Sequence, residues 1–227
     1  MRRRFRLSLI LAVIGLPVSG FFIAGSVWPT ELAARASVPQ SSHNGDPLSA
    51  DELARLAPGD FILRRGNSLV SRLIVYSLGE PTGYSHCGIL WPDPASGTWQ
   101  VIHSVSEALS GTDGLRREPL ADFWRKSLPD STTVVRYRAD QATVAAMLET
   151  ANRLLAAPPA FDNGFQLGGD SLYCSELLWL VLPATERGSF IRLQAPIGVI
   201  RFESFLDPAW FETILDHRMA AARPDEP

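Results

Sequence analysis

Residues 85–104 read SHCGILWPDPASGTWQVIHS, and this stretch decides the fold class. Apolar and small residues over 85–91 and 98–104 flank a segment rich in proline, aspartate and glycine, which is typical of two strands joined by a turn. If the turn is symmetric, Trp91 faces Thr98 and His86 lies directly opposite His103. Cross-strand neighbours of this kind have Cβ atoms roughly 5 Å apart. The hairpin therefore predicts adjacent imidazoles, whereas a slip of one residue would place them on opposite faces.

Helical patterns lie on both sides of this hairpin. Capping residues or apolar residues at helical spacing mark a short helix opening at 49–53 and longer helices at 68–78, 141–157 and 173–182. Further strands are expected at 61–63 and 132–137. The sequence thus predicts an α+β fold in which an antiparallel sheet packs against helices.

The first 36 residues are expected to form a separate segment, a signal peptide or a membrane anchor. Arg2, Arg3, Arg4 and Arg6 precede the 22 residues of 7–28, which carry no charge. This layout is typical of an export signal. The run is long enough to span a bilayer, which favours an anchor, whereas the A-x-A pattern at 34–36 favours cleavage. We expect export to the periplasm or cell envelope, with cleavage or inner-membrane anchoring left open.

The rest of the chain divides into a linker at 37–48, rich in Ser, Pro, Asn and Gly, one domain at 49–219 and a loose tail at 220–227. The formal net charge of the chain is −3. This small charge indicates no nucleic-acid partner.

Cys174 stands at the start of the helix predicted over 173–182. The N-terminus of a helix lowers the pKa of a thiol, and only the thiolate is a useful nucleophile. Asp170 or Ser171 is available as the N-cap. Leu177 shares the face of the cysteine, so the thiol is expected to point inward.

A thiol nucleophile also needs a base and a group that orients the base. His86 and His103, at facing positions of the hairpin, can supply both. Cys87 follows His86 on the strand and so points to the opposite face, where we expect it to pack in the core. The predicted catalytic residues are therefore Cys174, His86 and His103.

Two other interpretations of these residues remain open. Cys87 and Cys174 could form a disulfide in an exported protein, which would disable the nucleophile. His86, His103 and Cys174 could bind zinc together with a carboxylate, although the sequence has no C-x-x-C or H-x-x-x-H pair. No G-x-S-x-G motif indicates a serine nucleophile. We expect no metal and no cofactor.

The chain resembles the circularly permuted papain-like thiol hydrolases related to NlpC, and within them the YiiX-like amidases. The resemblance covers most of residues 58–182. The matching segments are Gly59-Asp60-Phe61-Ile62 with Arg65-Gly66, Tyr84-Ser85-His86-Cys87-Gly88-Ile89, the strand that carries His103, Phe161-Asp162 with Phe165, and Tyr173-Cys174-Ser175-Glu176-Leu177.

The resemblance implies a permuted papain-like (NlpC-type) core with Cys174 as nucleophile and His86 as base. It departs from the YiiX-like pattern at the third position, where His103 stands in place of a carboxylate. A Cys-His-His set is instead similar to the lecithin:retinol acyltransferase-like enzymes. Tyr84 and Tyr173 are candidates for oxyanion or substrate contacts, beside the backbone N–H of Cys174.

The expected function is therefore hydrolysis of an amide bond, in a cell-wall peptide or an acylated amine, through an acyl-cysteine. The alternative enzyme is a lipid acyltransferase or deacylase, which the membrane segment would suit. A third hypothesis is an envelope protein without catalytic activity. The expected partners are a peptide, a peptidoglycan fragment or a lipid as substrate, and the membrane through the N-terminal segment.

Overall fold

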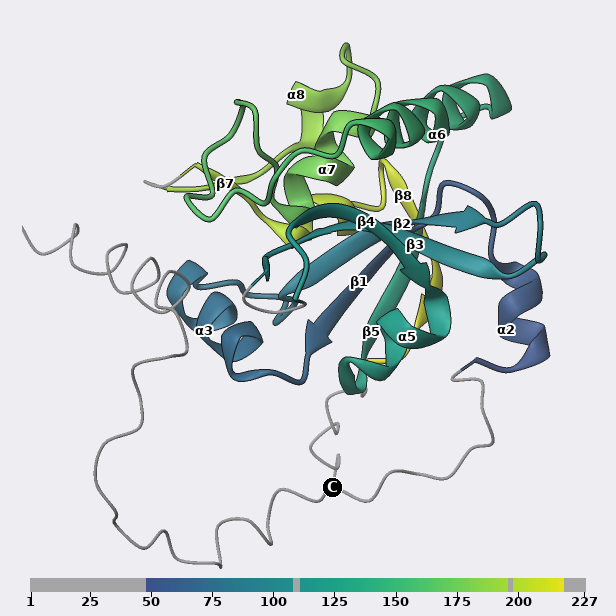
Figure 1. The fold of residues 1–227 in the computed structure, drawn as a ribbon, viewed down its shortest axis with the longest axis horizontal. Helices are drawn as coiled ribbons and strands as arrows, with labels where there is room; N and C mark the ends of the chain where they lie inside the picture. The colour runs from purple at the N-terminus through teal and green to yellow at the C-terminus, as the bar shows by residue number, and fades with distance from the viewer. Residues whose placement is uncertain (1–47, 108–110, 196–197, 219–227) are drawn as a thin grey trace, which may run out of the picture.

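In the computed structural model, which describes residues 48–107, 111–195 and 198–218, a six-stranded antiparallel sheet has the order β4-β3-β2-β1-β5-β8 (Figure 1). The strands are β1 (Phe61–Gly66), β2 (His86–Pro92), β3 (Trp99–Val105), β4 (Gly114–Pro119), β5 (Ser127–Tyr137) and β8 (Phe211–Asp216). A separate two-stranded ribbon pairs β6 (Leu193–Gln194) with β7 (Val199–Ile200).

Helices surround the sheet, so the predicted α+β class is confirmed. They are α2 (Ala50–Arg55), α3 (Leu69–Leu78), α5 (Leu120–Arg125), α6 (Gln141–Ala156), α7 (Cys174–Val181), α8 (Arg187–Phe190) and the 3-10 helix η2 (Phe202–Leu206). The predicted helices at 49–53, 68–78, 141–157 and 173–182 correspond to α2, α3, α6 and α7.

One boundary in each of two helices follows from the local sequence. Ser49 and Glu52 form a capping box on α2, each side chain accepting from the backbone N–H of the other. Gly79 ends α3 in the left-handed conformation, with φ of +57°.

The predicted N-terminal segment, most of the linker and the C-terminal tail lie outside the described residues. Across the ranges that the structure does describe, no helix has the length and apolar character needed to cross a membrane.

Alternating side chains give the sheet two buried faces. Leu63 and Ile89 point to the face covered by α6 and α7, and belong to the larger apolar cluster. Ile62 and Leu90, their chain neighbours, point to the other face and pack with Phe123 of α5. Successive side chains of β1 and β2 therefore pack in two different apolar clusters, one on each face of the sheet.

The register of the β2–β3 hairpin differs from the prediction by two residues. Trp91 pairs with Gln100 rather than Thr98. The turn is centred one residue later than expected, because the N–H of Asp93 donates to the carbonyl of Thr98 at 2.9 Å and the Asp93 carboxylate accepts from the loop that follows. A shift of two residues preserves the face of every side chain, so the two histidines still share a face.

Candidate active site

Cys174 is the first residue of α7 and is 6% exposed. The expected capping by Asp170 or Ser171 is wrong: the N-cap is Tyr173, and no side chain caps the helix. Tyr173 is buried, and its hydroxyl accepts a hydrogen bond from the backbone N–H of Ile200 at 3.2 Å. The uncapped N–H groups of the first turn are thus left facing the thiol rather than a capping oxygen.

The second cysteine lies beside the first. Cys87 points away from the side of His86, as predicted, but α7 packs on that face and brings Cys174 with it. Cys87 therefore packs in the core, as predicted, and it also contacts Cys174 there, which was not predicted. Both cysteines are free, so the described structure contains no disulfide between them.

The contact between the thiols determines which one ionises. The pKa of Cys174 is lowered, first by the hydrogen bond from the Cys87 side chain and then by backbone N–H groups that include that of Ser175, although burial opposes the shift. Burial and the neighbouring thiol raise the pKa of Cys87 well above its ordinary value. Cys174 is consequently the more acidic of the two thiols, and Cys87 is its hydrogen-bond donor.

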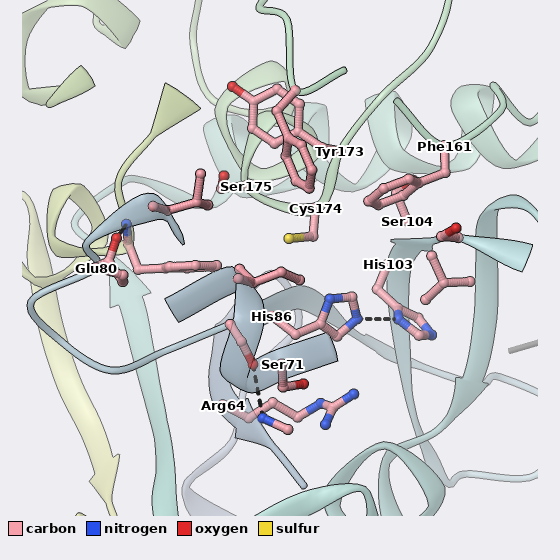
Figure 2. Close-up of a pocket in the computed structure, with 18 of the residues that line it drawn as sticks. Arg64, Ser71, Glu80, His86, His103, Ser104, Phe161, Tyr173, Cys174 and Ser175 are labelled. Carbon is pink, nitrogen blue, oxygen red and sulfur yellow. Dashed lines mark hydrogen bonds between the residues drawn. The ribbon is translucent and has the colours of Figure 1, made fainter. Parts of the chain in front are cut away.

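On the other face of the sheet, the two predicted histidines are in contact. Nε2 of His86 and Nδ1 of His103 are 2.7 Å apart, and the rings meet edge to face at 5.0 Å. Phe123 stacks on His86 at 5.4 Å. Figure 2 shows the His86 ring between Cys174 and the His103 ring. The order of side chains is the one that a nucleophile, a base and an orienting group require.

A buried carboxylate extends this row and was not predicted. Glu118 of β4 is 4% exposed, and its Oε1 lies 3.2 Å from Nε2 of His103. This distance is that of an ion pair; neither atom forms a hydrogen bond with any described residue. The other carboxylate oxygen of Glu118 is held by Arg116 at 3.1 Å and by Lys126 at 2.5 Å.

The position of the carboxylate favours one tautomer of each ring. A carboxylate accepts hydrogen bonds, so the tautomer of His103 that complements it carries the proton on Nε2 and leaves Nδ1 as an acceptor. Nε2 of His86 then donates to His103, which leaves the lone pair on Nδ1 of His86. That nitrogen has no hydrogen-bond partner among the described residues and is the one available to receive a proton from a thiol.

Arg64 supplies a buried positive charge on the same face as His86. It pairs with His86 in the sheet, is 8% exposed, and its guanidinium lies 4.6 Å from the centre of the Phe123 ring. Burial lowers the pKa of Arg64 to about 10, still high enough to stay charged. Burial first, and the charge of Arg64 second, lower the pKa of both His86 and His103 well below the ordinary value. Both rings are therefore neutral at neutral pH.

The thiol and the base share one pocket without touching. Cys174, His86 and His103 all line one cavity that is open to solvent. No hydrogen bond joins the Cys174 sulfur to His86 in the structure. Nε2 of His86 is shared with His103, and Nδ1 of His86 has no partner among the described residues. Catalytic hydrogen bonds are often long in the absence of substrate. The rest of the lining is mixed. It includes the apolar side chains of Ile74, Leu78, Phe161, Phe165, Val199 and Phe202 and the charged side chains of Arg64, Glu80, Arg116, Glu118, Lys126 and Arg201.

Of the two candidate tyrosines, only one lies at the cavity. Tyr173 lines the cavity beside the thiol. Tyr84 is not among the cavity residues; its hydroxyl bonds to Thr133, and its ring packs against Phe202 at 6.3 Å. The structure therefore does not bring Tyr84 to the thiol.

The metal-ligating side chains of the described residues do not form a metal centre. None of their His, Cys, Asp and Glu side chains gather in a group of three or more that could hold a metal ion. The ring nitrogens best placed to bind one, Nε2 of His86 and Nδ1 of His103, are directed at each other, and Nε2 of His103 faces Glu118. In this arrangement the residues do not fit a metal.

The comparisons with known proteins relate the fold to solved structures. The crystal structure of the metalloprotein YiiX from Escherichia coli O157:H7, described as DUF1105, matches 71% of this chain and 98% of its own, with a TM-score of 0.54. The two sequences are 19% identical over the match, and at this level the likeness concerns the fold alone. The chain is thus an α+β protein with a YiiX-like fold. No protein-family model and no curated protein matches it.

Proposed function

We propose that the protein is a thiol hydrolase with a permuted papain-like active site, in which Cys174 is the nucleophile and His86 the base. The observation that carries the proposal is the buried row His86–His103–Glu118, which leads to a thiol at a helix N-terminus. Each member needs the next one: the carboxylate sets the tautomer of His103, His103 sets that of His86, and His86 is left able to accept a proton. A structural role alone does not require that each ring donate its proton toward Glu118.

The proposed reaction begins when the sulfur of Cys174 attacks a carbonyl carbon. Where the thiol is still protonated, Nδ1 of His86 removes its proton in the same step. The backbone N–H groups at the start of α7 stabilise the oxyanion. The imidazolium then returns the proton to the leaving amine or alcohol, and a thioester remains on Cys174. Water deprotonated by the same ring releases the acid. An alcohol or amine acceptor in place of water would make the reaction an acyl transfer.

Two substrate classes fit this chemistry: an amide in a cell-wall peptide or acylated amine, and an acyl group of a lipid. The mixed lining suits both: Phe161 and Phe202 can pack against an acyl chain, and polar side chains such as Asn67 and Arg201 can pair with a peptide. The uncharged run at 7–28, which we propose exports or anchors the protein in the cell envelope, suits either substrate.

The test is mass spectrometry of Cys174 after incubation with peptidoglycan fragments and, separately, with phospholipid vesicles. An acyl adduct on Cys174 that is absent from the His86→Ala variant supports the proposal, and its mass names the acyl group. The Cys87→Ser variant is the matched control and should still be acylated. A chain that forms no adduct from either substrate, while its thiol reacts normally with iodoacetamide, would favour the non-catalytic hypothesis.

A further inference from the structure

The large apolar side chains that are exposed in the described structure gather on the elements around the mouth of the cavity. They are Leu69 (61% exposed) and Tyr76 (84%) on α3, Leu167 (39%) in the loop before α7, and Leu193 (48%) on β6. We call these four residues the mouth surface. Each of the three elements also contributes to the cavity, through Ile74, Phe165 and Gln194 respectively.

Helix α3 is unusual for a surface helix of this domain. Only Ser71 and Leu78 are buried among its ten residues, although seven of the ten are Leu, Val, Ile or Tyr. Figure 1 shows α3 and the β6–β7 ribbon on the same side of the molecule, and Arg201 links them by donating to the carbonyl of Gly79 at 3.1 Å. An apolar helix face that none of the described elements covers is typical of an interaction site.

The charges on this side identify the partner. Arg72 lies on α3 between Leu69 and Tyr76, and Arg192 precedes Leu193; both are exposed, and neither forms an ion pair with any described residue. Helix α3 contains no acidic residue. A second copy of the chain would bring the same positive charges against this face, whereas the headgroups of anionic phospholipids would neutralise them.

We propose that the mouth surface docks on an anionic phospholipid bilayer, with α3 lying in the interface and the cavity opening toward the lipid. Apolar residues combined with unpaired arginines are characteristic of helices that lie in the plane of a membrane surface. The chain itself favours this partner. The 19 residues of 29–47 that join the uncharged run to the domain reach at most about 65 Å when fully extended.

If the uncharged run lies in a bilayer, this connection keeps the domain near the lipid surface, so that docking becomes an intramolecular event. Docking also deepens the proposed function, on which this step rests. It would give the cavity its substrate directly from the membrane, as an acyl group of a phospholipid or lipid amide.

The experiment uses the full chain reconstituted in vesicles that contain a phospholipid with a photoactivatable acyl chain. Vesicles of phosphatidylcholine alone are compared with vesicles that also contain phosphatidylglycerol. After illumination, lipid adducts are mapped by mass spectrometry. Adducts on α3 and β6, more abundant with phosphatidylglycerol, are expected in addition to those on residues 7–28, which report successful reconstitution.

The variant Leu69→Ser/Tyr76→Ser should lower the adducts on α3 and β6 at least about fivefold, since it removes the most exposed apolar area. Its adducts on residues 7–28 should not change. The matched control, Ala145→Ser/Ala146→Ser, alters two exposed residues of α6, which does not line the cavity, and should behave as the parent chain.

Adducts confined to residues 7–28 in the parent chain would overturn the docking surface and favour another occupant of α3. The Cys174→Ala variant should retain all adducts, so a failure of the proposed chemistry remains distinguishable from a failure of docking.

Discussion

The two faces of the sheet meet at the start of β2 and carry different chemistry. On the face covered by α7, Cys87 and Cys174 lie among apolar side chains, and one thiol stabilises the ionised form of the other. On the face covered by α5, His86 leads to a buried carboxylate whose other oxygen is held by two cations. Because His86 and Cys87 are adjacent in the sequence, one strand supplies both faces. The acidity of the nucleophile and the protonation of the base can therefore be perturbed separately.

Removal of the base is expected to have the largest effect. His86→Ala should lower the rate of Cys174 acylation at least about 1000-fold, because His103, the other described imidazole that lines the cavity, lies beyond His86 from Cys174. The thiol itself should still react with iodoacetamide, since its low pKa arises on the opposite face. Acylation at the parental rate would show that His86 is not the base.

Substitution of the orienting group should cost less. We expect His103→Ala to lower the acylation rate about 10- to 100-fold, and His103→Gln to recover part of that loss, because an amide can still accept from Nε2 of His86. Bound zinc is assayed in the same samples. Equal and complete loss in both variants, with the fold intact and zinc released, would instead indicate a metal ligand.

Glu118→Gln tests the far end of the row. The amide has the same shape but no charge, so it should lower the acylation rate about tenfold. It should also move the acid limb of the pH–rate profile to lower pH, because a negative charge no longer stabilises the imidazolium. Glu212→Gln, at an exposed position of β8, is the matched control. A lower acylation rate without a shift in the pH–rate profile would show that Glu118 has only a structural role.

The buried imidazoles should also make the stability of the fold depend on pH. His103 is 1% exposed and neutral when folded, whereas in the unfolded chain it binds a proton as the pH falls through about 6.5. The unfolding free energy should therefore decrease by about 1.4 kcal/mol per pH unit below that value. His86 is partly exposed and should add less. Urea unfolding at pH 7.5 and 5.5 measures the slope, and His103→Gln should reduce it; an unchanged slope in the variant would contradict a neutral, buried His103.

The smallest effect is expected from the neighbouring thiol. Cys87→Ala removes the hydrogen-bond donor and should raise the pKa of Cys174, which lowers its labelling by iodoacetamide a few-fold at neutral pH. Cys87→Ser keeps a donor and should react at nearly the parental rate. Labelling of Cys87 ahead of Cys174 in the parent chain would reverse the assignment of the two thiols.

Local patterns predicted much of the fold and part of the candidate site. The hairpin and the helix that begins at Cys174 were evident because alternation and helical spacing are local signals. The parity of the strand placed the two histidines on one face even though the register was wrong by two. Turn geometry, set by side-chain contacts of Asp93, could not be derived from the pattern.

Contacts that depend on tertiary packing were missed. β4 reads Gly-Leu-Arg-Arg-Glu-Pro, a charged segment ending in proline that resembles a loop, so Glu118 gave no signal of burial. Its role depends on Arg116 and Lys126, which neutralise it only in the folded chain. The contact between Cys87 and Cys174 likewise depends on which face α7 covers, and alternation alone does not determine that.

The close spacing of β2 and β3 also limits which substitutions the chain can tolerate. Gly88 lies two residues after His86 in a strand that is buried on both faces. A Cβ at this position would lie 2.4 Å from Cγ1 of Val101 and 2.8 Å from the carbonyl oxygen of Ile102, with Cβ of His103 at 3.1 Å. Even a methyl group would push apart the strands that carry the two imidazoles. Substitutions at position 88 should therefore be selected against, because they would disturb the contact between the two histidines. Gly88 itself takes no part in the chemistry.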